Sequence, residues 1–441
     1  MTSPTTDTEH DPVELLRSLI RFDTSNPPGH ERECLEYVGG ILGEVGIESR
    51  FLARDPERPN LVARLPGRGD APPLLLYGHV DVVPANASEW SHPPFAAEVV
   101  DGEIWGRGTL DMKGGVAMLV AALLRAATER LEPAGDLILA LSPDEERGSK
   151  FGAKYLVEEH AGLFEGVRYG LSEFGGFTQW TGGRPLYPIQ VAEKQRCLIR
   201  ATIRGEGGHP STVVRGTAAA KLGRLLRTLE KKRLPVHVTP VLRSMVAAMA
   251  SGLPVHERLA LRPALVPALT DRLLDLFGKD GDSLDPLLHN MATPTVIRGG
   301  ESTNVVPTEL TVDLDGRVLP GQTPRDLVRE LEALVPGVAQ FEIVEEEPAA
   351  KAEPDLALMP MLTKIINEKE PSGTPFPMLL PGYTDARYFS QLGIQTYGFL
   401  PMRLPKHITT ALIHAPDERI PAGAVEFGAD CVYEAIRRYR V

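Results

Sequence analysis

Two adjacent glutamates, Glu145 and Glu146, follow an apolar run in the segment Leu141-Ser-Pro-Asp-Glu-Glu-Arg-Gly148. Neighbouring loop residues point in different directions, so one carboxylate can bind a metal ion while the other acts as a base toward a metal-bound water. An acidic pair after a strand is also typical of a solvated turn. The pair therefore gains meaning only from other residues that could join the same site.

A histidine and an aspartate stand where another apolar run ends, in Gly78-His79-Val-Asp81-Val-Val-Pro84. Ligands in open α/β sheets gather at the carboxyl ends of strands. His79 could bind a metal through its neutral imidazole, and Asp81 could hold the other ring nitrogen. The alternative is a histidine that only caps a loop.

Three further residues complete the candidate set: Asp111 ahead of an alanine-rich helix, Glu173 after a strand, and His414 ahead of the terminal helix. The glycines around Asp111 lack the Gly-x-x-x-x-Gly-Lys-Ser/Thr spacing of a phosphate loop. Asp111 could be a helix N-cap or a carboxylate that bridges two cations. Two histidines and three carboxylates, with Glu145 left over, suit two zinc ions, for which cobalt or manganese could substitute.

The elements that must position these residues alternate between strand and helix patterns. The sequence predicts strands at residues 60–65, 73–77, 136–141, 167–171 and 395–400. It predicts helices from Asp11 and at residues 31–44, 115–130, 152–160, 356–367 and 422–438. This alternation indicates an α/β fold with a mixed, mostly parallel sheet flanked by helices.

The pattern changes after Tyr187. The sequence predicts a strand at 188–203, a helix at 213–229, an irregular Pro- and Leu-rich stretch at 235–290, a strand near Thr295, a strand at 309–318, a helix at 324–334 and a strand at 340–344. The order β-α-β-β-α-β is typical of a small α+β domain. We expect residues 188–348 to be inserted into a catalytic domain made of residues 1–187 and 349–441.

Composition limits the partners and the compartment. A net charge of −12 argues against a nucleic-acid partner. The three cysteines have no paired spacing, which argues against disulfides and a thiolate zinc site. The polar N-terminus lacks the features of a signal peptide, and the longest apolar helical stretch, residues 116–124, is short of the ~20 residues that span a bilayer. We expect a cytoplasmic protein without a membrane partner.

Taken together, the motifs resemble those of the dinuclear-zinc amidohydrolases, the family of aminoacylase, bacterial glutamate carboxypeptidase, acetylornithine deacetylase and succinyl-diaminopimelate desuccinylase. Nearly the whole chain is covered, and the motifs follow the family's order: Gly78-His-Val-Asp-Val-Val-Pro84, Trp90-Ser-His-Pro-Pro-Phe95, Gly106-Arg-Gly-Thr-Leu-Asp-Met-Lys-Gly114, Asp144-Glu-Glu-Arg-Gly148 and the C-terminal histidine. The resemblance implies the following roles: His79 and Glu173 on one zinc, Glu146 and His414 on the other, Asp111 as the bridge, Glu145 as general base, and Asp81 orienting His79.

The same resemblance implies roles outside the ligand set. His209, in Gly205-Glu-Gly-Gly-His209-Pro-Ser211, matches a histidine that stabilises the oxyanion, often in the partner subunit. Asn304 and Arg317 match positions that meet the substrate's carbonyl and carboxylate, although a turn residue and a salt bridge are equally good local interpretations.

One loop departs from the family pattern. The resemblance implies that Gly382 and Thr384 belong to a loop near the substrate carboxylate, and we expect both to contact the substrate. Many relatives have Gly-Gly-Thr/Ser-x-Asp in this loop, whereas this chain has Pro381-Gly-Tyr-Thr-Asp385. The bulky Tyr383 and the stiff Pro381 should change the shape of the pocket.

The implied function is hydrolysis of an amide bond in an N-acyl amino acid or small peptide with a free carboxylate, by zinc-activated water with Glu145 as base. An aminopeptidase or dipeptidase of the same family is the alternative, although Glu173 favours deacylases and carboxypeptidases. A non-catalytic binding protein on this fold would have lost Glu145 or a ligand, and none is missing. The substrate would be a small molecule or short peptide, and a homodimer through the inserted domain is expected.

Overall fold

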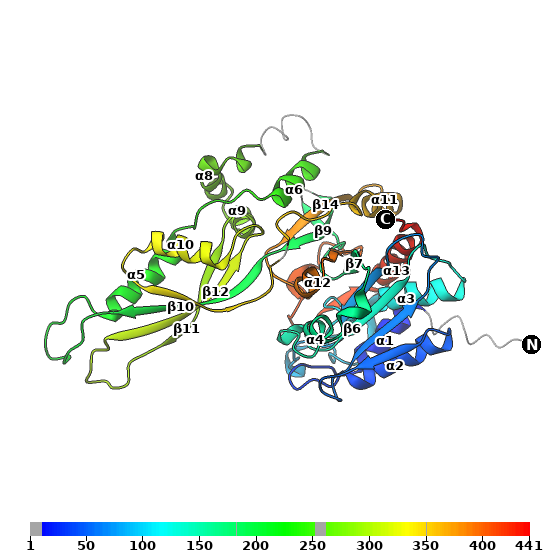
Figure 1. The fold of residues 1–441 in the computed structure, drawn as a ribbon, viewed down its shortest axis with the longest axis horizontal. Helices are drawn as coiled ribbons and strands as arrows, with labels where there is room; N and C mark the ends of the chain where they lie inside the picture. Colours follow the sequence, from blue (N-terminus) through cyan, green and yellow to red (C-terminus); the bar gives the residue numbers. More distant parts are fainter. Residues whose placement is uncertain (1–10, 182, 252–261, 350) are drawn as a thin grey trace, which may run out of the picture. The chain divides into compact units, whose positions relative to one another are not determined.

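The computed structural model describes residues 11–181, 183–251, 262–349 and 351–441. The chain forms two compact units (Figure 1). The first comprises Met1–Val191, Asp355–Met378 and Thr384–Val441, and the second Ala192–Pro354 and Leu379–Tyr383. The polar N-terminal residues 1–10, and residues 252–261 of the Pro- and Leu-rich stretch, lie outside the described residues.

The first unit is built on a mixed nine-stranded sheet with the order β1-β2-β6-β3-β7-β15-β9-β14 and with β8 beside β9. Its strands are β1 (Ser49–Leu52), β2 (Asn60–Leu65), β3 (Leu74–His79), β6 (Leu137–Ser142), β7 (Tyr169–Ser172), β8 (Gln179–Thr181), β9 (Arg184–Glu193), β14 (Thr374–Leu380) and β15 (Gln395–Gly398). The central strands β6, β3, β7 and β15 are parallel to one another, whereas β1, β2 and β9 pair antiparallel. The predicted mostly parallel α/β sheet is confirmed.

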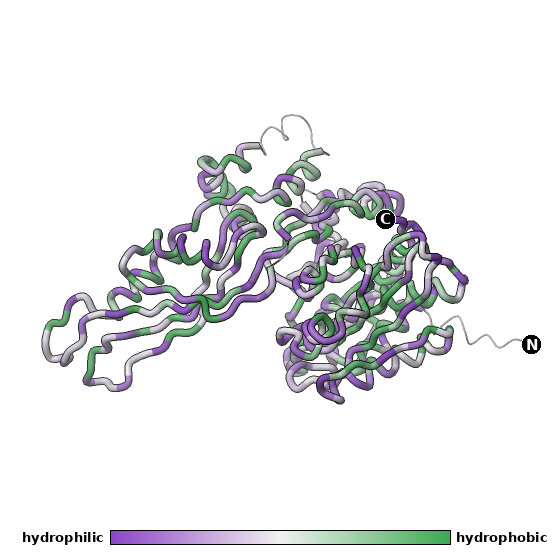
Figure 2. The backbone as a smooth tube through the Cα atoms, in the orientation of Figure 1, coloured by the Kyte–Doolittle hydropathy of each residue, from purple (hydrophilic) through white to green (hydrophobic). Residues whose placement is uncertain are grey.

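Helices cover both faces of this sheet (Figure 1). They are α1 (Pro12–Arg21), α2 (Arg32–Glu44), α3 (Lys113–Thr128), α4 (Ala153–Glu159), α11 (Met359–Lys369), α12 (Ala386–Gln391) and α13 (Ala422–Arg438). On one face, α3 packs on β3 and between α1 and α13. On the other face, α4 and α12 bury Leu156 and Phe389 against Tyr77 and Ile138. The inner strands β3 and β6 are buried along their whole length and nearly all apolar, as parallel strands covered on both sides must be (Figure 2).

The start of α3 lies close to the end of β3 because Gly78 has no side chain. A Cβ on Gly78 would lie 2.9 Å from Cε of Met112 and 3.2 Å from Cγ2 of Val116. Any larger residue would push the two elements apart. The glycine therefore lets the loop that carries Asp111 approach the strand end that carries His79.

A small three-stranded sheet, β16-β5-β4, lies in the same unit. It joins β4 (Val99–Val100), β5 (Glu103–Trp105) and β16 (Arg419–Pro421). The antiparallel pairing of β5 with β16 brings the segment before α13 to the segment before α3. These are the segments that contain His414 and Asp111.

The second unit contains a four-stranded antiparallel sheet with the order β11-β12-β10-β13. Its main elements are β10 (Gln195–Arg204), α5 (Ala218–Lys231), β11 (Met291–Arg298), β12 (Glu309–Val318), α10 (Pro324–Leu334) and β13 (Gln340–Glu346). Alternate β10 residues such as Ile199 pack against Leu225 of α5 and Leu327 of α10. The predicted β-α-β-β-α-β order is confirmed. Its role as a lid or dimerisation domain stays a prediction.

The single strand predicted at residues 188–203 is in fact two strands, β9 and β10, which end and begin on either side of Lys194. They belong to different sheets. No glycine or proline marks the break, and Glu193 and Lys194 are themselves buried. Four consecutive polar residues, Glu193-Lys-Gln-Arg196, interrupt the alternation at this point, and the single predicted strand does not account for them.

The stretch at 235–290 is not irregular where it is described. It contains the helices α6 (Pro240–Ser251), α8 (Pro267–Phe277) and α9 (Lys279–Leu284). Two of its prolines begin helices, at a position where no backbone N–H is needed, and the Thr239 hydroxyl accepts from the N–H of Leu242 at 3.3 Å.

The sequence analysis also missed strand β14. Pro375 and Pro377 argue against a strand, but β14 is last in the sheet order, and prolines are tolerated in edge strands. None of the described helices has the length and apolarity that a membrane span requires.

Candidate metal centre

Three neighbouring parallel strands end at the candidate site. β3 ends at His79, β6 ends shortly before Glu145, and β7 ends next to Glu173. In the sheet register His79 lies opposite Ser142, the last residue of β6. The carboxyl ends of the strands therefore bring these side chains together, as expected for an open α/β sheet.

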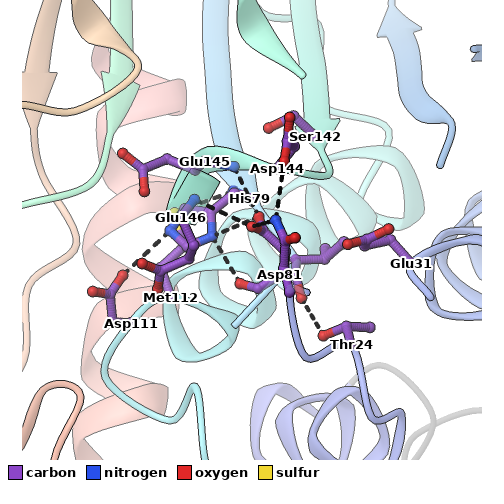
Figure 3. Close-up of polar contacts among 12 residues, drawn as sticks. Thr24, Glu31, His79, Asp81, Asp111, Met112, Ser142, Asp144, Glu145 and Glu146 are labelled. Carbon is purple, nitrogen blue, oxygen red and sulfur yellow. Dashed lines mark hydrogen bonds and ion pairs between the residues drawn. The ribbon is translucent and has the colours of Figure 1, made fainter. Parts of the chain in front are cut away.

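The carboxylate of Asp111 lies between the two histidines of the candidate set. Its Oδ1 is 3.2 Å from Nε2 of His79, and its Oδ2 is 3.4 Å from Nε2 of His414. Figure 3 shows His79 with Asp111 on one side and Asp81 on the other. Each oxygen of Asp111 faces a different imidazole, which is the arrangement that a carboxylate bridging two metal ions needs.

The remaining contacts fall into two groups. Oε2 of Glu173 lies 3.5 Å from Nε2 of His79, and Oε1 of Glu146 lies 3.1 Å from Nε2 of His414. Possible ligand atoms of His79, Glu145 and Glu173 all lie within 4.8 Å of one another, as do those of His79, Asp111 and Glu146. Glu145 is thus near enough to be a ligand, and its role as base stays a prediction.

The residues present fit a pair of divalent cations. Oε1 of Glu173 is buried and has no hydrogen-bond partner within the described parts of the chain. Leaving a buried polar atom without a partner costs about 1–3 kcal/mol, and more for a charged group. A cation beside this oxygen removes that cost, and the nitrogen and oxygen donors here suit zinc, cobalt or manganese.

Burial and mutual contact shift the pKa values of the cluster. Burial raises the pKa of Glu173 to about 7, against the hydrogen bond to His79. Burial, and then the charge of Glu173, raise the pKa of Glu145 well above its ordinary value. Burial lowers the pKa of His79, but hydrogen bonds to Asp111, Asp81 and Glu173 outweigh it and raise that pKa strongly. Strongly shifted pKa values in one cluster of buried groups are common at functional sites.

The histidine of the second group is also shifted. Hydrogen bonds to Asp111 and Glu146 raise the pKa of His414 to about 10. The backbone of His414 has a left-handed φ of 63°, which is uncommon for a residue with a Cβ. The half-exposed imidazole thus reaches two carboxylates that the protein keeps nearby.

Asp81 contacts the acidic loop as well as His79, the residue that it was predicted to orient. Its buried carboxylate lies 3.3 Å from Nδ1 of His79 and accepts hydrogen bonds from the backbone N–H groups of Glu145 at 3.0 Å and Glu146 at 3.2 Å. The side-chain amide of Asn26 donates to Asp81 at 2.9 Å and to Asp144 at 3.0 Å. The acidic loop is therefore fixed to the same group as His79.

The sequence analysis missed Glu418 and Arg107, although both stand in or beside the quoted motifs. The buried carboxylate of Glu418 accepts from the N–H groups of Leu110 at 2.7 Å and Asp111 at 3.2 Å, and pairs with Arg107 at 2.7 Å. Arg107 in turn donates to the carbonyl oxygen of His414 at 3.2 Å. This ion pair ties the Asp111 loop to the His414 loop.

Asp385 was also missed as a functional candidate. It is fully buried and accepts hydrogen bonds from the hydroxyls of Tyr77 and Ser149. Tyr388 donates to the carbonyl oxygen of Gly148 at 3.1 Å. Ser149 and Gly148 belong to the loop that carries Glu145 and Glu146, so the segment around Asp385 holds this loop from the far side. The predicted substrate residue Thr384 is buried beside Asp385.

The other predicted substrate residues belong to the second unit. His209 is exposed, with Nδ1 2.7 Å from the Ser211 hydroxyl. Asn304 is exposed and accepts a hydrogen bond from Ser302. The roles of these two residues and of Gly382 toward the metal centre stay predictions.

Arg317 makes two contacts inside the second unit. It pairs with Asp315 through two hydrogen bonds, at 2.6 and 3.3 Å. Its guanidinium also lies 4.7 Å from the ring centre of Tyr383, the residue that departs from the family pattern. The local salt bridge that the sequence left open is therefore present, and it does not exclude a substrate contact.

Comparisons with known sequences give a consistent result. Residues 75–438 match the peptidase family M20/M25/M40. Mouse (Mus musculus) aminoacylase-1 is 25% identical over 95% of this chain and 93% of its own length. Succinyl-diaminopimelate desuccinylase of Cereibacter sphaeroides is 28% identical over 94% of this chain and 95% of its own.

Comparisons with solved structures support the same fold. An M20 family metallo-carboxypeptidase from Sulfolobus solfataricus superposes with a TM-score of 0.69, covering 98% of this chain and 99% of that one at 17% identity. A protein from Bacillus subtilis, described as a dinuclear metal binding peptidase of the M20 family, has a TM-score of 0.62 and 14% identity over 98% of both chains.

Proposed function

The chain belongs to the peptidase family M20/M25/M40 and is a hydrolase, and on that premise we propose that it is a metal-dependent amidohydrolase. Its substrate is an N-acyl amino acid or a small peptide with a free carboxylate. The position of Asp111 between His79 and His414, with Glu145 beside them, carries this assignment. The names of the sequence relatives support it, since an aminoacylase and a desuccinylase both cleave an acyl group from nitrogen.

The residues divide the chemistry among them. Two divalent ions, with zinc as the first candidate, polarise the amide carbonyl and lower the pKa of the attacking water when bound. Glu145 takes the proton of that water and delivers it to the departing nitrogen. The raised pKa of its carboxyl suits a group that must hold a proton between two steps. The hydrogen bond from its backbone N–H to Asp81 holds the backbone of Glu145 in place.

The carboxylate end of the substrate is assigned to Arg317, because the planar guanidinium can pair with both carboxylate oxygens. Gly382, Thr384 and Asn304 are proposed to position the substrate, and His209 to stabilise the oxyanion, within a homodimer built on the inserted domain. A cytoplasmic location is part of the proposal and is supported by three cysteines that are all buried and unpaired.

A substrate panel tests this function. Zinc- or cobalt-loaded protein would be assayed with N-acetyl and N-succinyl amino acids, with dipeptides whose amino group is free or blocked, and with the same compounds carrying an amidated carboxylate. We expect blocked substrates with a free carboxylate to be cleaved and amidated ones to be spared. Cleavage of free-amine peptides alone would assign an aminopeptidase or dipeptidase, and cleavage of none would contradict the proposal.

A further inference from the structure

An apolar pocket of the first unit opens beside the metal centre. The proposed ligands Asp111 and Glu173 line it at one end. The rest of its wall includes Phe177, Leu400, Met402 and Leu404, whose exposed fractions are 7%, 4%, 4% and 3%. The cavity volume of the pocket is about 30 Å³, so the pocket has room for a short apolar group. Two proposed metal ligands thus belong both to the centre and to the pocket.

The wall is fixed by backbone contacts. The N–H of Leu400 donates to the carbonyl oxygen of Gly175 at 3.0 Å, and the N–H of Thr178 donates to that of Met402 at 2.9 Å. A Cβ on Gly175 would lie 2.4 Å from the carbonyl oxygen of Gly398, so the glycine permits this close approach. The ring of Phe177 packs edge-on against that of Phe174 at 5.4 Å. The wall of the pocket is therefore built within one unit and held in place by backbone contacts.

The lining excludes a charged occupant. Among the described residues, no lysine or arginine lines the pocket, and the ionisable side chains there are the carboxylates of Asp111 and Glu173. A substrate carboxylate placed there would lose its hydration without gaining a cation of the protein. The group that enters must be uncharged and apolar.

We propose that this pocket binds the apolar acyl chain of the substrate, on the carbonyl side of the scissile amide. This assignment rests on the proposed function. The acyl chain begins at the reacting carbonyl carbon, which sits at the metal centre that Asp111 and Glu173 share with the pocket. A side chain of the amino acid would start from the Cα that also bears the free carboxylate, and would draw that carboxylate toward the same two acidic residues.

A chain-length series tests the assignment. N-acetyl, N-butanoyl, N-hexanoyl and N-octanoyl alanine would be compared with N-acetyl derivatives of amino acids of increasing side-chain size. We expect kcat/KM to rise about fourfold for each added acyl methylene until the pocket is full, as burial of a methylene predicts. A rate that follows the amino-acid side chain and ignores the acyl chain would overturn the assignment.

A pair of variants tests the wall itself. Thr410 lines the pocket and is half-buried, whereas its neighbour Ala411 on the same turn is exposed and lies outside the lining. Thr410→Phe fills the pocket and should lower the octanoyl-to-acetyl ratio of kcat/KM by about tenfold or more. The matched control Ala411→Phe should leave that ratio unchanged. Equal ratios in Thr410→Phe and the unmodified protein would contradict the assignment.

Binding provides a readout that does not depend on turnover. Calorimetry would compare octanoate with acetate on metal-loaded protein, with metal content checked in each variant. We expect octanoate to bind more tightly than acetate, and Thr410→Phe to remove the difference. This pattern supports the pocket even if no N-acyl amino acid is hydrolysed, in which case only the proposed function fails. Equal binding of octanoate and acetate to the unmodified protein would overturn the pocket assignment.

Discussion

Oδ1 of Asp81 accepts a hydrogen bond from the backbone N–H of Glu145 at 3.0 Å. The other oxygen of the same carboxylate accepts from the N–H of Glu146 at 3.2 Å, and Nδ1 of His79 lies 3.3 Å from Oδ1. A single buried side chain thus fixes a proposed ligand at the end of β3 and the acidic loop after β6. The family resemblance implies only the contact of Asp81 with His79.

Asp81→Asn should therefore weaken the metal centre and the catalytic loop together. An asparagine amide cannot accept on both sides, so one of the loop N–H groups loses its partner. We expect metal affinity and turnover each to fall by about 10- to 100-fold. Metal titration and steady-state kinetics on the same preparation measure both.

Asp136 provides the control for that variant. It stands just before β6, at the opposite end of the strand, and accepts from the N–H of Gly67 at 2.7 Å. Asp136→Asn should cost stability without changing metal affinity. An equal loss of metal affinity in both variants would show that Asp81 acts only through general stability.

Asp385→Asn should lower turnover while the metal content stays unchanged. The buried carboxylate accepts from the hydroxyl of Ser149, which follows the two glutamates. Displacing a catalytic group slightly is enough to lower a rate strongly, so we expect kcat to fall by about tenfold or more. Ser149→Ala removes the same tie and should reproduce the loss in part. Full activity in both variants would remove Asp385 from the positioning of the loop.

Metal binding should release protons at neutral pH. The pKa of His414 is raised to about 10 by Asp111 and Glu146, so this imidazole is protonated in the metal-free protein at pH 7. Hydrogen bonds to Asp111, Asp81 and Glu173 raise the pKa of His79 in the same direction, against the effect of burial. A ligand imidazole must be neutral, and His414 therefore loses a proton on binding. Calorimetry in buffers of different ionisation enthalpy measures the release, and affinity should fall as pH falls. Heats that do not depend on the buffer would contradict the histidine assignment.

The second unit should lose stability in acid through Asp313. Hydrogen bonds from Arg200 at 2.7 Å and Arg298 at 2.5 Å lower the pKa of this carboxyl to about 2. A carboxyl whose pKa is lowered by folding stabilises the folded state at pH values above its unfolded pKa of about 4. That stability is lost as the pH falls from about 4 toward 2. Because both arginines are partly exposed, we expect Asp313→Asn to cost on the order of 1 kcal/mol at pH 7.

Unfolding of Asp313→Asn and the unmodified protein in urea at pH 7 and pH 2 checks this sign. The difference in the free energy of unfolding should be present at pH 7 and largely absent at pH 2. A difference of the same size at both pH values would mean that ionisation of Asp313 does not stabilise the unit.

Much of the candidate site could be predicted because its residues stand at the ends of apolar runs. His79, Glu145 and Glu173 follow strands whose parallel order places their ends side by side. The terminal helix α13 begins and ends where the sequence predicts it, at Ala422 and Arg438. A single sequence is enough to predict a helix or strand when its buried residues recur with the period of that element.

The residues that hold these ligands could not be found in the same way. Asp385 and Glu418 accept hydrogen bonds from segments far away in the sequence, and nothing in their own surroundings marks them as buried. The break at Lys194 coincides with four consecutive polar residues, 193–196, but nothing in the sequence shows that β9 and β10 join different sheets. Long-range burial decides these positions, and a single sequence does not record it.

The central claim is that the adjacent glutamates have different roles, with Glu145 moving a proton and Glu146 binding a metal ion. Glu146→Gln is the matched variant, which should lose metal because the contact of His414 with a charged carboxylate is lost. The most direct test is the metal content and kcat of Glu145→Gln. The account predicts that this variant keeps the same metal content as the unmodified protein while kcat falls by about 10²- to 10⁴-fold. Substantial residual turnover, or loss of metal from Glu145→Gln, would contradict it.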